Sequence, residues 1–235
     1  MWSGAWRAEW CAVAWRAEWP VAWPRGAARS RAARGAVRSG AVAWAGGTRP
    51  AGGARARLRL SDHWARMAPD SIDVRPAEPR DAEAVAAIYN HGIAERQATF
   101  ETRPRRANEI LGWLEEGRPF IVAAGEEGTI LGFARVSAYS TRRAYAGVGE
   151  HAVYVAPAAR GRGVGVKLLE ALAHASENAG YYKLTSRVFT TNEASLKLHR
   201  AAGFTEVGIQ KHHGRLDNEW KDTVLVERLL GEAAH

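Results

Sequence analysis

Residues 153–172 read VYVAPAARGRGVGVKLLEAL and place a strand, a glycine-rich turn and a helix in direct succession. An apolar run ends just before the glycines, and the leucines after them fall on one stripe of an amphipathic helix. Unpaired backbone N–H groups converge at such a turn, and the helix dipole adds positive potential there. The turn RGRGVG, residues 160–165, is therefore predicted to bind a phosphate-bearing ligand.

The residues around this turn argue against several other interpretations of it. A Walker loop needs a hydroxyl residue after Gly-Lys, but Gly165 is followed by Val166, Lys167 and Leu168. The dinucleotide fingerprint G-x-G-x-x-G also differs from the G-x-G-x-G spacing found here. An Arg-Gly element of a disordered chain would not lead into a regular helix. A tight turn that binds no ligand stays open.

The chain of 235 residues divides into two parts of different composition. Residues 1–66 contain twelve arginines, no lysine and three acidic residues, whereas residues 67–235 are nearly neutral, with twenty-one basic and twenty-two acidic residues. The overall charge of +8 thus belongs to the front segment, and the second part gives no reason to expect a nucleic-acid partner.

The front segment, residues 1–66, is rich in Ala, Arg, Gly and Trp and has no sustained helical or strand period. It is expected to be disordered, or to be a start-site extension, because globular patterning begins at Met67. A transit peptide, or an arm that touches membranes or nucleic acid, is the alternative. No stretch is long and apolar enough for a membrane span. The single cysteine, Cys11, lies here, so residues 67–235 can form no disulfide or cysteine–zinc site.

Residues 67–235 alternate strand and helix signals and are predicted to form one domain of mixed α/β class. The order is one strand, two helices, two strands joined by a hairpin, a third strand, a helix, a strand, a helix and two last strands. One parallel crossover among antiparallel hairpins predicts a mixed sheet. The predicted strands are 71–77, 119–125, 129–139, 150–157, 181–189, 205–213 and 219–230, and the predicted helices are 81–93, 106–117, 164–180 and 192–204.

These motifs resemble the Gcn5-related N-acetyltransferase (GNAT) superfamily, in which an R/Q-x-x-G-x-G/A turn binds the pyrophosphate of coenzyme A. Arg160, Gly163 and Gly165 match that turn, and NEASLKLHRAAGF resembles the superfamily's N-x-x-A/S helix ending in Gly-Phe. The segments ATFETRP, RRAYAGVGEHAVYV and the late W-x-D are similar to the phosphinothricin acetyltransferase branch, and GEHAVYV and KLTSR to its arsinothricin enzymes. The resemblance implies a mainly antiparallel sheet of six to seven strands with about four helices.

The resemblance also implies the residues that bind acetyl-CoA, with no metal. Backbone N–H groups of the fourth strand would bond the pantetheine arm and stabilise the oxyanion, and the turn and Asn192 would contact the rest of the cofactor. The implied cofactor residues are Val153, Tyr154, Val155, Arg160, Gly161, Arg162, Gly163, Val164, Gly165, Val166 and Asn192.

Acetyl transfer requires a deprotonated amine, and a free α-amino group with a pKa of about 8 is mostly protonated at neutral pH. Glu150 is the implied base; a carboxylate that caps a strand end or pairs with His151 is the alternative. His199 stands where many relatives place a tyrosine acid, so it could serve as acid or base, with a structural histidine as the alternative. Arg142, Arg143 and Tyr145 could hold the acceptor's acidic groups, with solvated surface charge as the alternative.

Phe100 could line the acceptor pocket or belong to the core. The resemblance implies an enzyme that acetylates the α-amine of a phosphinothricin- or arsinothricin-like small molecule and thereby confers resistance. The alternative acceptors are methionine sulfoximine or sulfone, a polyamine and a protein N-terminus. A non-catalytic acyl-CoA-binding module is the remaining alternative. A cytoplasmic homodimer without nucleic-acid or membrane partners is expected.

Overall fold

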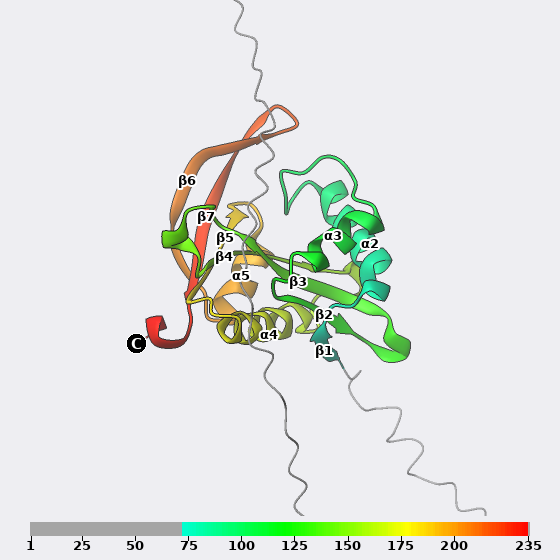
Figure 1. The fold of residues 1–235 in the computed structure, drawn as a ribbon. Coiled ribbons are helices and arrows are strands. Elements are labelled where there is room, and N and C mark those ends of the chain that lie inside the picture. The colour runs from blue at the N-terminus through cyan, green and yellow to red at the C-terminus, as the bar shows by residue number, and fades with distance from the viewer. Residues whose placement is uncertain (1–71, 235) are drawn as a thin grey trace, which may run out of the picture. The chain divides into compact units, whose positions relative to one another are not determined.

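One seven-stranded sheet organises the computed structural model, which describes residues 72–234 (Figure 1). The predicted front segment and its boundary at Met67 lie outside the described residues. The strand order is β1-β2-β3-β4-β5-β7-β6. The strands are β1 Asp73–Pro76, β2 Phe120–Ala124, β3 Ile130–Ala138, β4 Val148–Val155, β5 Lys183–Phe189, β6 Thr205–Leu216 and β7 Glu219–Leu229.

Adjacent strands pair antiparallel throughout this sheet except at the β4–β5 boundary, which is parallel. The parallel pair follows from the connection, because a strand can return in the same direction only after a crossover, here a helix. The mixed, mainly antiparallel α/β sheet predicted from the sequence is confirmed. β6 extends to Leu216, three residues beyond its predicted end.

Helices cover both faces of the sheet. In Figure 1, α4 lies on one side of the strands, and α2 and α3 lie on the other. The hydrophobic clusters agree, since one cluster unites α4 with β2, β3 and β5 and the other unites α2 and α3 with β2 and β3. The helices are α2 Ala82–Glu95, α3 Ala107–Glu115, α4 Val164–Asn178 and α5 Glu193–Ala201.

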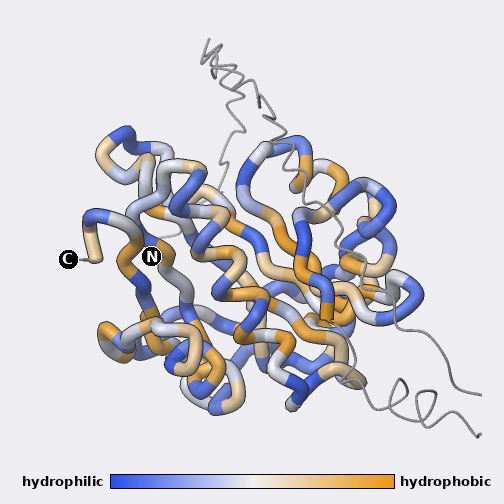
Figure 2. The backbone as a smooth tube through the Cα atoms, turned by 90° about the horizontal axis from the view of Figure 1, so that it is seen from below, coloured by the Kyte–Doolittle hydropathy of each residue, from blue (hydrophilic) through white to orange (hydrophobic). Residues whose placement is uncertain are grey.

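The central strands are buried on both faces, which explains their nearly continuous apolar sequences. Successive side chains of β3 alternate between the two clusters, since Ala134 and Val136 pack on the α4 side and Phe133 packs on the α2–α3 side. Figure 2 shows the apolar segments running through the interior and polar segments at the periphery.

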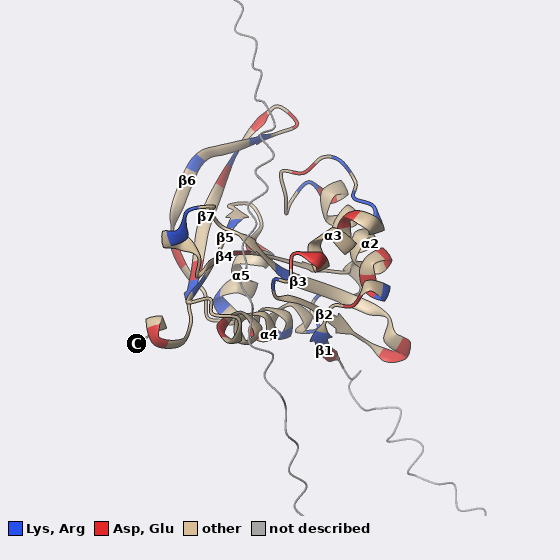
Figure 3. Cartoon of the chain, in the orientation of Figure 1, with Lys and Arg blue, Asp and Glu red and all other residues tan. Residues whose placement is uncertain are grey.

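Basic and acidic residues are interspersed over the described part of the chain (Figure 3). Both signs occur on the loop that follows α2 and on the β6–β7 hairpin, whereas α2 itself carries only the acidic Glu83 and Glu95. Within residues 72–234, no helix combines the length and the apolar character that crossing a bilayer would require.

Leu172 of α4 belongs to the hydrophobic core between α4 and the sheet. Its side chain is 0% exposed. We expect Leu172→Ala to lower the free energy of unfolding by about 2–5 kcal/mol, because the truncation leaves a cavity among packed neighbours. Leu229→Ala is the matched control: Leu229 is 44% exposed, and its loss should change stability by about 0.5 kcal/mol or less. Urea unfolding of both variants measures the difference, and equal losses would contradict this packing.

Candidate active site

β4 and β5 separate after a short paired stretch. Their register joins Val148–Glu150 to Lys183–Thr185, and within the described residues no further β4–β5 pair follows. Ala152–Val155 of β4 and Ser186–Phe189 of β5 then line a cavity of about 520 Å³. The diverging strands thus leave backbone groups of β4 available to an extended ligand that lies between them.

The turn at the mouth of this cavity uses its three glycines in two ways. Gly161 and Gly163 have φ angles of 75° and 78°, in the left-handed region that glycine adopts without strain. Gly165 lies in the first turn of α4, where an added Cβ would stand 2.9 Å from the side chain of Leu198 on α5. The first two glycines therefore shape the turn, and the third allows α4 and α5 to approach each other.

Arg160 reaches across the cavity to α2. Its guanidinium donates two hydrogen bonds of 2.7 Å to the carboxylate of Glu95, and its Nε donates to the carbonyl of Val155 at 3.3 Å. The hydrogen bond from Arg160 lowers the pKa of Glu95. Arg160 is therefore already held by a carboxylate at the place where a phosphate would bind.

Asn192 caps α5 and also ties it to the loop after α2. Its Oδ1 accepts from the backbone N–H of Ser195 at 3.0 Å, and its Nδ2 donates to the carbonyl of Gln97 at 2.9 Å. Of the predicted cofactor residues, all but Arg162 line the first cavity, and Arg162 lies exposed in the same turn. Their contact with a cofactor remains a prediction.

A second cavity, of about 660 Å³, adjoins the first on the α2–α3 side of the sheet. The two cavities share residues of β4 and β5, including Ala152, Tyr154 and Arg187. The second cavity is also lined by Glu150 and Arg135. The arrangement provides one slot with the predicted anion-binding turn and a neighbouring pocket with a carboxylate and two guanidinium groups.

Glu150 lies at the point where the strands begin to separate, and its carboxylate accepts a 2.7 Å hydrogen bond from Arg187 of β5. The side chains are partly exposed, 37% for Glu150 and 28% for Arg187. This ion pair fixes the direction of the carboxylate. The predicted base is thus positioned in the second cavity, beside the slot.

Two buried histidines, His151 of β4 and His199 of α5, join these two elements, and His151 is next to Glu150 in the chain. The Nε2 atoms of His151 and His199 are 3.0 Å apart. His199 Nδ1 lies 2.7 Å from the carbonyl oxygen of Ser195, which can only accept, so Nδ1 carries a proton. In the neutral pair His199 Nε2 therefore accepts from His151 Nε2–H. Burial lowers the pKa of both rings, that of His151 well below 6.5, with the adjacent His199 adding to the shift.

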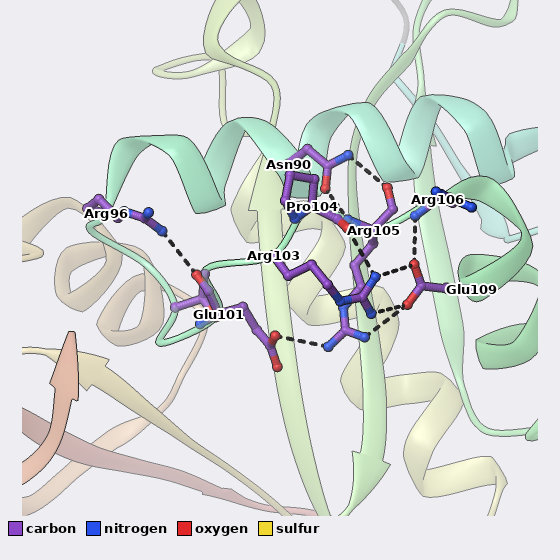
Figure 4. Close-up of polar contacts among 9 residues, drawn as sticks. Asn90, Arg96, Glu101, Arg103, Pro104, Arg105, Arg106 and Glu109 are labelled. Atoms are coloured by element: carbon purple, nitrogen blue, oxygen red, sulfur yellow. Dashed lines mark hydrogen bonds and ion pairs between the residues drawn. The ribbon is translucent and has the colours of Figure 1, made fainter. Parts of the chain in front are cut away.

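The loop between α2 and α3 forms the outer wall of the second cavity and is held by a polar network (Figure 4). Glu109 accepts from the side chains of Arg103 and Arg105 and from the backbone N–H of Arg106, contacts that lower its pKa to about 2. Asn90 of α2 bonds both the N–H and the carbonyl of Arg105. The loop is therefore tied to both helices.

Phe100 projects from this loop into the wall of the second cavity. Its ring meets that of Phe189 edge to face at 4.8 Å between centroids. A Cβ added at Gly214 of β6 would lie 2.7 Å from the Phe100 ring, so this glycine leaves the space that the ring occupies. Phe100 thus packs against Phe189 and also lines the second cavity, and its contact with an acceptor stays a prediction.

Arg142, Arg143 and Tyr145 lie exposed ahead of β4 and are not among the residues that line either cavity. Their substrate role remains a prediction. Arg135 and Arg187, which do line the second cavity, were missed in the sequence analysis. The available signal was a single arginine within an otherwise mostly apolar stretch of strand, ILGFARVSA in β3 and TSRVF in β5.

Among residues 72–234 no three His, Cys, Asp or Glu side chains gather in a way that could hold a metal ion. The described residues can supply three kinds of chemistry. A carboxylate can transfer a proton, guanidinium groups can bind an anion and backbone amides can donate hydrogen bonds.

The histidine pair predicts an acid-sensitive fold. Burial lowers the pKa of both rings in the folded chain, whereas both bind protons below about pH 6.5 when unfolded, so the stability they support is present above that pH and is lost as the pH falls. We expect the free energy of unfolding to fall by up to about 1 kcal/mol per histidine between pH 7.5 and 5.5. Urea unfolding at both pH values measures the loss, which His151→Gln should reduce and His174→Gln, an exposed control on α4, should not. An unchanged loss in His151→Gln would contradict the assignment.

Comparison with known proteins agrees with this geometry. The chain is 38% identical over 162 residues to a phosphinothricin N-acetyltransferase of Alcaligenes faecalis, covering 67% of this chain and 82% of that protein. It is 30% identical over 167 residues to an L-methionine sulfoximine/L-methionine sulfone acetyltransferase of Salmonella typhimurium, covering 69% of this chain and 97% of that protein.

A solved GNAT superfamily phosphinothricin acetyltransferase from Sinorhizobium meliloti, in complex with acetyl-CoA, superposes with a TM-score of 0.65. It is 31% identical and covers 69% of this chain and 90% of that one. The sequence model of the Acetyltransferase (GNAT) family matches residues 85–204, from α2 to the end of the α5 region. The superfamily expected from the sequence motifs is confirmed, and the chain belongs to the Acetyltransferase (GNAT) family.

Proposed function

We propose that this chain transfers an acetyl group from acetyl-CoA to the α-amino group of a small amino-acid analogue of the phosphinothricin kind. The observation that carries the proposal is the meeting of the two cavities at β4. One contains an anion-binding turn and unpaired strand backbone, and the other contains Glu150 beside two arginines. The names of the phosphinothricin and methionine sulfone relatives support the substrate class.

The first cavity fits acetyl-CoA, which supplies the activated acetyl group. Amides at the start of α4 and the guanidinium of Arg160 would bind its pyrophosphate, and Arg160 would exchange Glu95 for phosphate oxygens. Backbone groups of Val153–Val155 would bond the pantetheine arm as an added strand. The thioester would then lie near Ala152, where the two cavities meet.

Glu150 would act as the base for the amine in the second cavity. The amine nitrogen must lose a proton before it bonds to the acetyl carbon, and the thiol of coenzyme A leaves as the carbon–sulfur bond breaks. The carboxylate held by Arg187 can take that proton directly or through one water. Backbone N–H groups of Val153–Val155 would stabilise the charge that develops on the carbonyl oxygen.

His199 would act through its neighbours in this proposal. Its Nδ1 donates to Ser195 and its Nε2 accepts from His151, so in the neutral pair neither ring nitrogen is available to a ligand. A proton for the departing thiolate would require this pair to rearrange. The geometry therefore supports Glu150 as the base and gives His199 the role of holding α5 against β4.

We also propose a cytoplasmic homodimer with arsinothricin among the acceptors, as the family resemblance implies. The support for self-association is β6, the strand at the end of the sheet order, which exposes Val207 and Ile209 at 54% and 58%. The support for arsinothricin is the resemblance of GEHAVYV and KLTSR alone.

The test of the reaction follows free thiol release from acetyl-CoA by the full chain, with phosphinothricin, arsinothricin, methionine sulfoximine or no amine. We expect amine-dependent turnover, and we expect Glu150→Gln to lower kcat by about 100-fold or more while the KM for acetyl-CoA is unchanged. Glu170→Gln, at an exposed carboxylate of α4, is the control. Full activity in Glu150→Gln would remove Glu150 as the base, and no turnover with any amine would refute the acceptor class.

The loop network makes a second prediction for the same assay. Glu109→Gln weakens the contacts to Arg103 and Arg105 and so loosens the loop that carries Phe100. We expect the KM of the acceptor to rise about 3- to 10-fold, with the KM of acetyl-CoA unchanged. Glu115→Gln at the exposed end of α3 serves as the control. Equal changes in both KM values would show that the loop does not act on the acceptor alone.

A further inference from the structure

Arg135 is the charged residue of β3 that faces the second cavity. Its neighbours Ala134 and Val136 point to the α4 side, so Arg135 shares the α2–α3 face with Phe133. The side chain is only 14% exposed, and its guanidinium lies 4.3 Å from the centroid of the Trp113 ring. The stack holds the guanidinium in a fixed plane against the cavity wall.

The positive charge of Arg135 is incompletely balanced. Its ion-pair partner is Glu116, at 3.2 Å, and the same carboxylate oxygen lies 3.4 Å from Nε of Arg118. Glu116 is itself 40% exposed. Burial lowers the pKa of Arg135 in spite of Glu116, since the charged form has been largely removed from water. Two guanidinium groups thus share one hydrated carboxylate, and one of them lines a cavity.

The position of Arg135 relative to Glu150 matches the span of a small amino acid. Arg135 pairs across the strands with Ala152, and Glu150 is two residues from Ala152 on the same face of β4. Such diagonal neighbours lie about 7–8 Å apart at the backbone. The short side chain of Ala152 leaves the floor between them open. An amine near Glu150 would therefore place a group about three bonds further along the molecule within reach of Arg135.

We propose that Arg135 binds the distal acidic group of the acceptor and makes the enzyme prefer amino acids with an anionic side chain over neutral isosteres. The inference rests on the proposed acetyl transfer to an α-amine. Arg187, the other arginine of the cavity, donates a hydrogen bond to Glu150 and so lies closer to the proposed position of the amine. Arg142 and Arg143 do not line the cavity. Glu150 would thus take the proton, and Arg135 would select the side chain of the acceptor.

Phosphinothricin and methionine sulfone provide a matched pair of probes. Both carry the α-amine and α-carboxylate, and their side chains end in a methylphosphinate and a methylsulfone of nearly the same shape, the first anionic and the second neutral. With the full chain we expect phosphinothricin to be preferred in kcat/KM. Arg135→Gln should lower kcat/KM for phosphinothricin by about 10- to 100-fold and for methionine sulfone by about 3-fold or less.

Two further variants separate binding from a structural effect. Arg118→Gln removes the arginine that shares Glu116 but does not line the cavity, and it should leave the ratio of the two substrates unchanged. Arg135→Lys should recover part of the preference, because the charge remains while the planar fork is lost. Equal losses for both substrates in Arg135→Gln would overturn the proposal, as would a wild-type enzyme that prefers methionine sulfone.

Calorimetric titration distinguishes failure of this inference from failure of the proposed function. Phosphinothricin and methionine sulfone are titrated into the wild type and Arg135→Gln in the presence of coenzyme A. If neither is acetylated, the proposed function fails, yet tighter wild-type binding of phosphinothricin that is lost in Arg135→Gln would still support the anion site. If both are acetylated but Arg135→Gln affects them alike, the function stands and the role of Arg135 is refuted. Absence of binding as well as turnover refutes both.

Discussion

The separation of β4 from β5 is the constraint on which the rest of this site depends. Paired strands would satisfy each other's backbone groups and leave no slot, whereas here the pairing stops at Glu150 and the strand continues to Val155. The same divergence opens the slot beneath the turn and brings the second cavity to its edge. Because α4 must return the chain from the end of β4 to the start of β5, the first turn of that helix, with its unpaired amides, necessarily lies at the mouth of the slot.

The fold holds the diverging strand from its other side. β3 pairs with β4 along its length, from Gly149 to Val155, so the part of β4 that leaves β5 is still supported. The neutral pair of His151 and His199 adds a link from β4 to α5 in the dry interior. The Ser195 carbonyl, one helical turn before His199, satisfies His199 Nδ1, whereas His151 Nδ1 is buried without a hydrogen-bond partner among the described residues.

Most of the fold could be predicted from the sequence, because apolar period and turn residues dictate each element locally. The antiparallel hairpins, the α4 crossover and the stop at Gly180 all follow from such signals. The strand–turn–helix arrangement around residues 160–165 was predicted for the same reason, since its glycines, strand and helix are contiguous, and phosphate binding there stays a prediction. The second cavity was not. Arg135 and Arg187 belong to different strands, and only the sheet register brings them beside Glu150.

Arg142 and Arg143, predicted from their place near a motif, are exposed and line neither cavity, so their substrate role stays a prediction. An arginine inside an apolar strand is the stronger signal, because burial of a charge is costly unless another element supplies a partner. The structure meets that cost for both strand arginines with a carboxylate from another element, Glu150 for Arg187 and Glu116 for Arg135, and the exposed Arg160 of the turn also has a partner in Glu95.

These three pairs differ in how completely the carboxylate neutralises the arginine. Glu95 binds Arg160 through two hydrogen bonds and Glu150 binds Arg187 at 2.7 Å, but Glu116 lies 3.2 Å from Arg135 and is divided between two arginines. An anion that enters the slot must compete with a well-formed pair, so the extra amides of the turn are needed there. An anion that enters the second cavity would meet at Arg135 a largely buried charge that lies against Trp113 and shares its carboxylate with Arg118. Under the proposed role of Arg135, discrimination between acidic and neutral acceptors would be concentrated where the charges of the protein are least balanced.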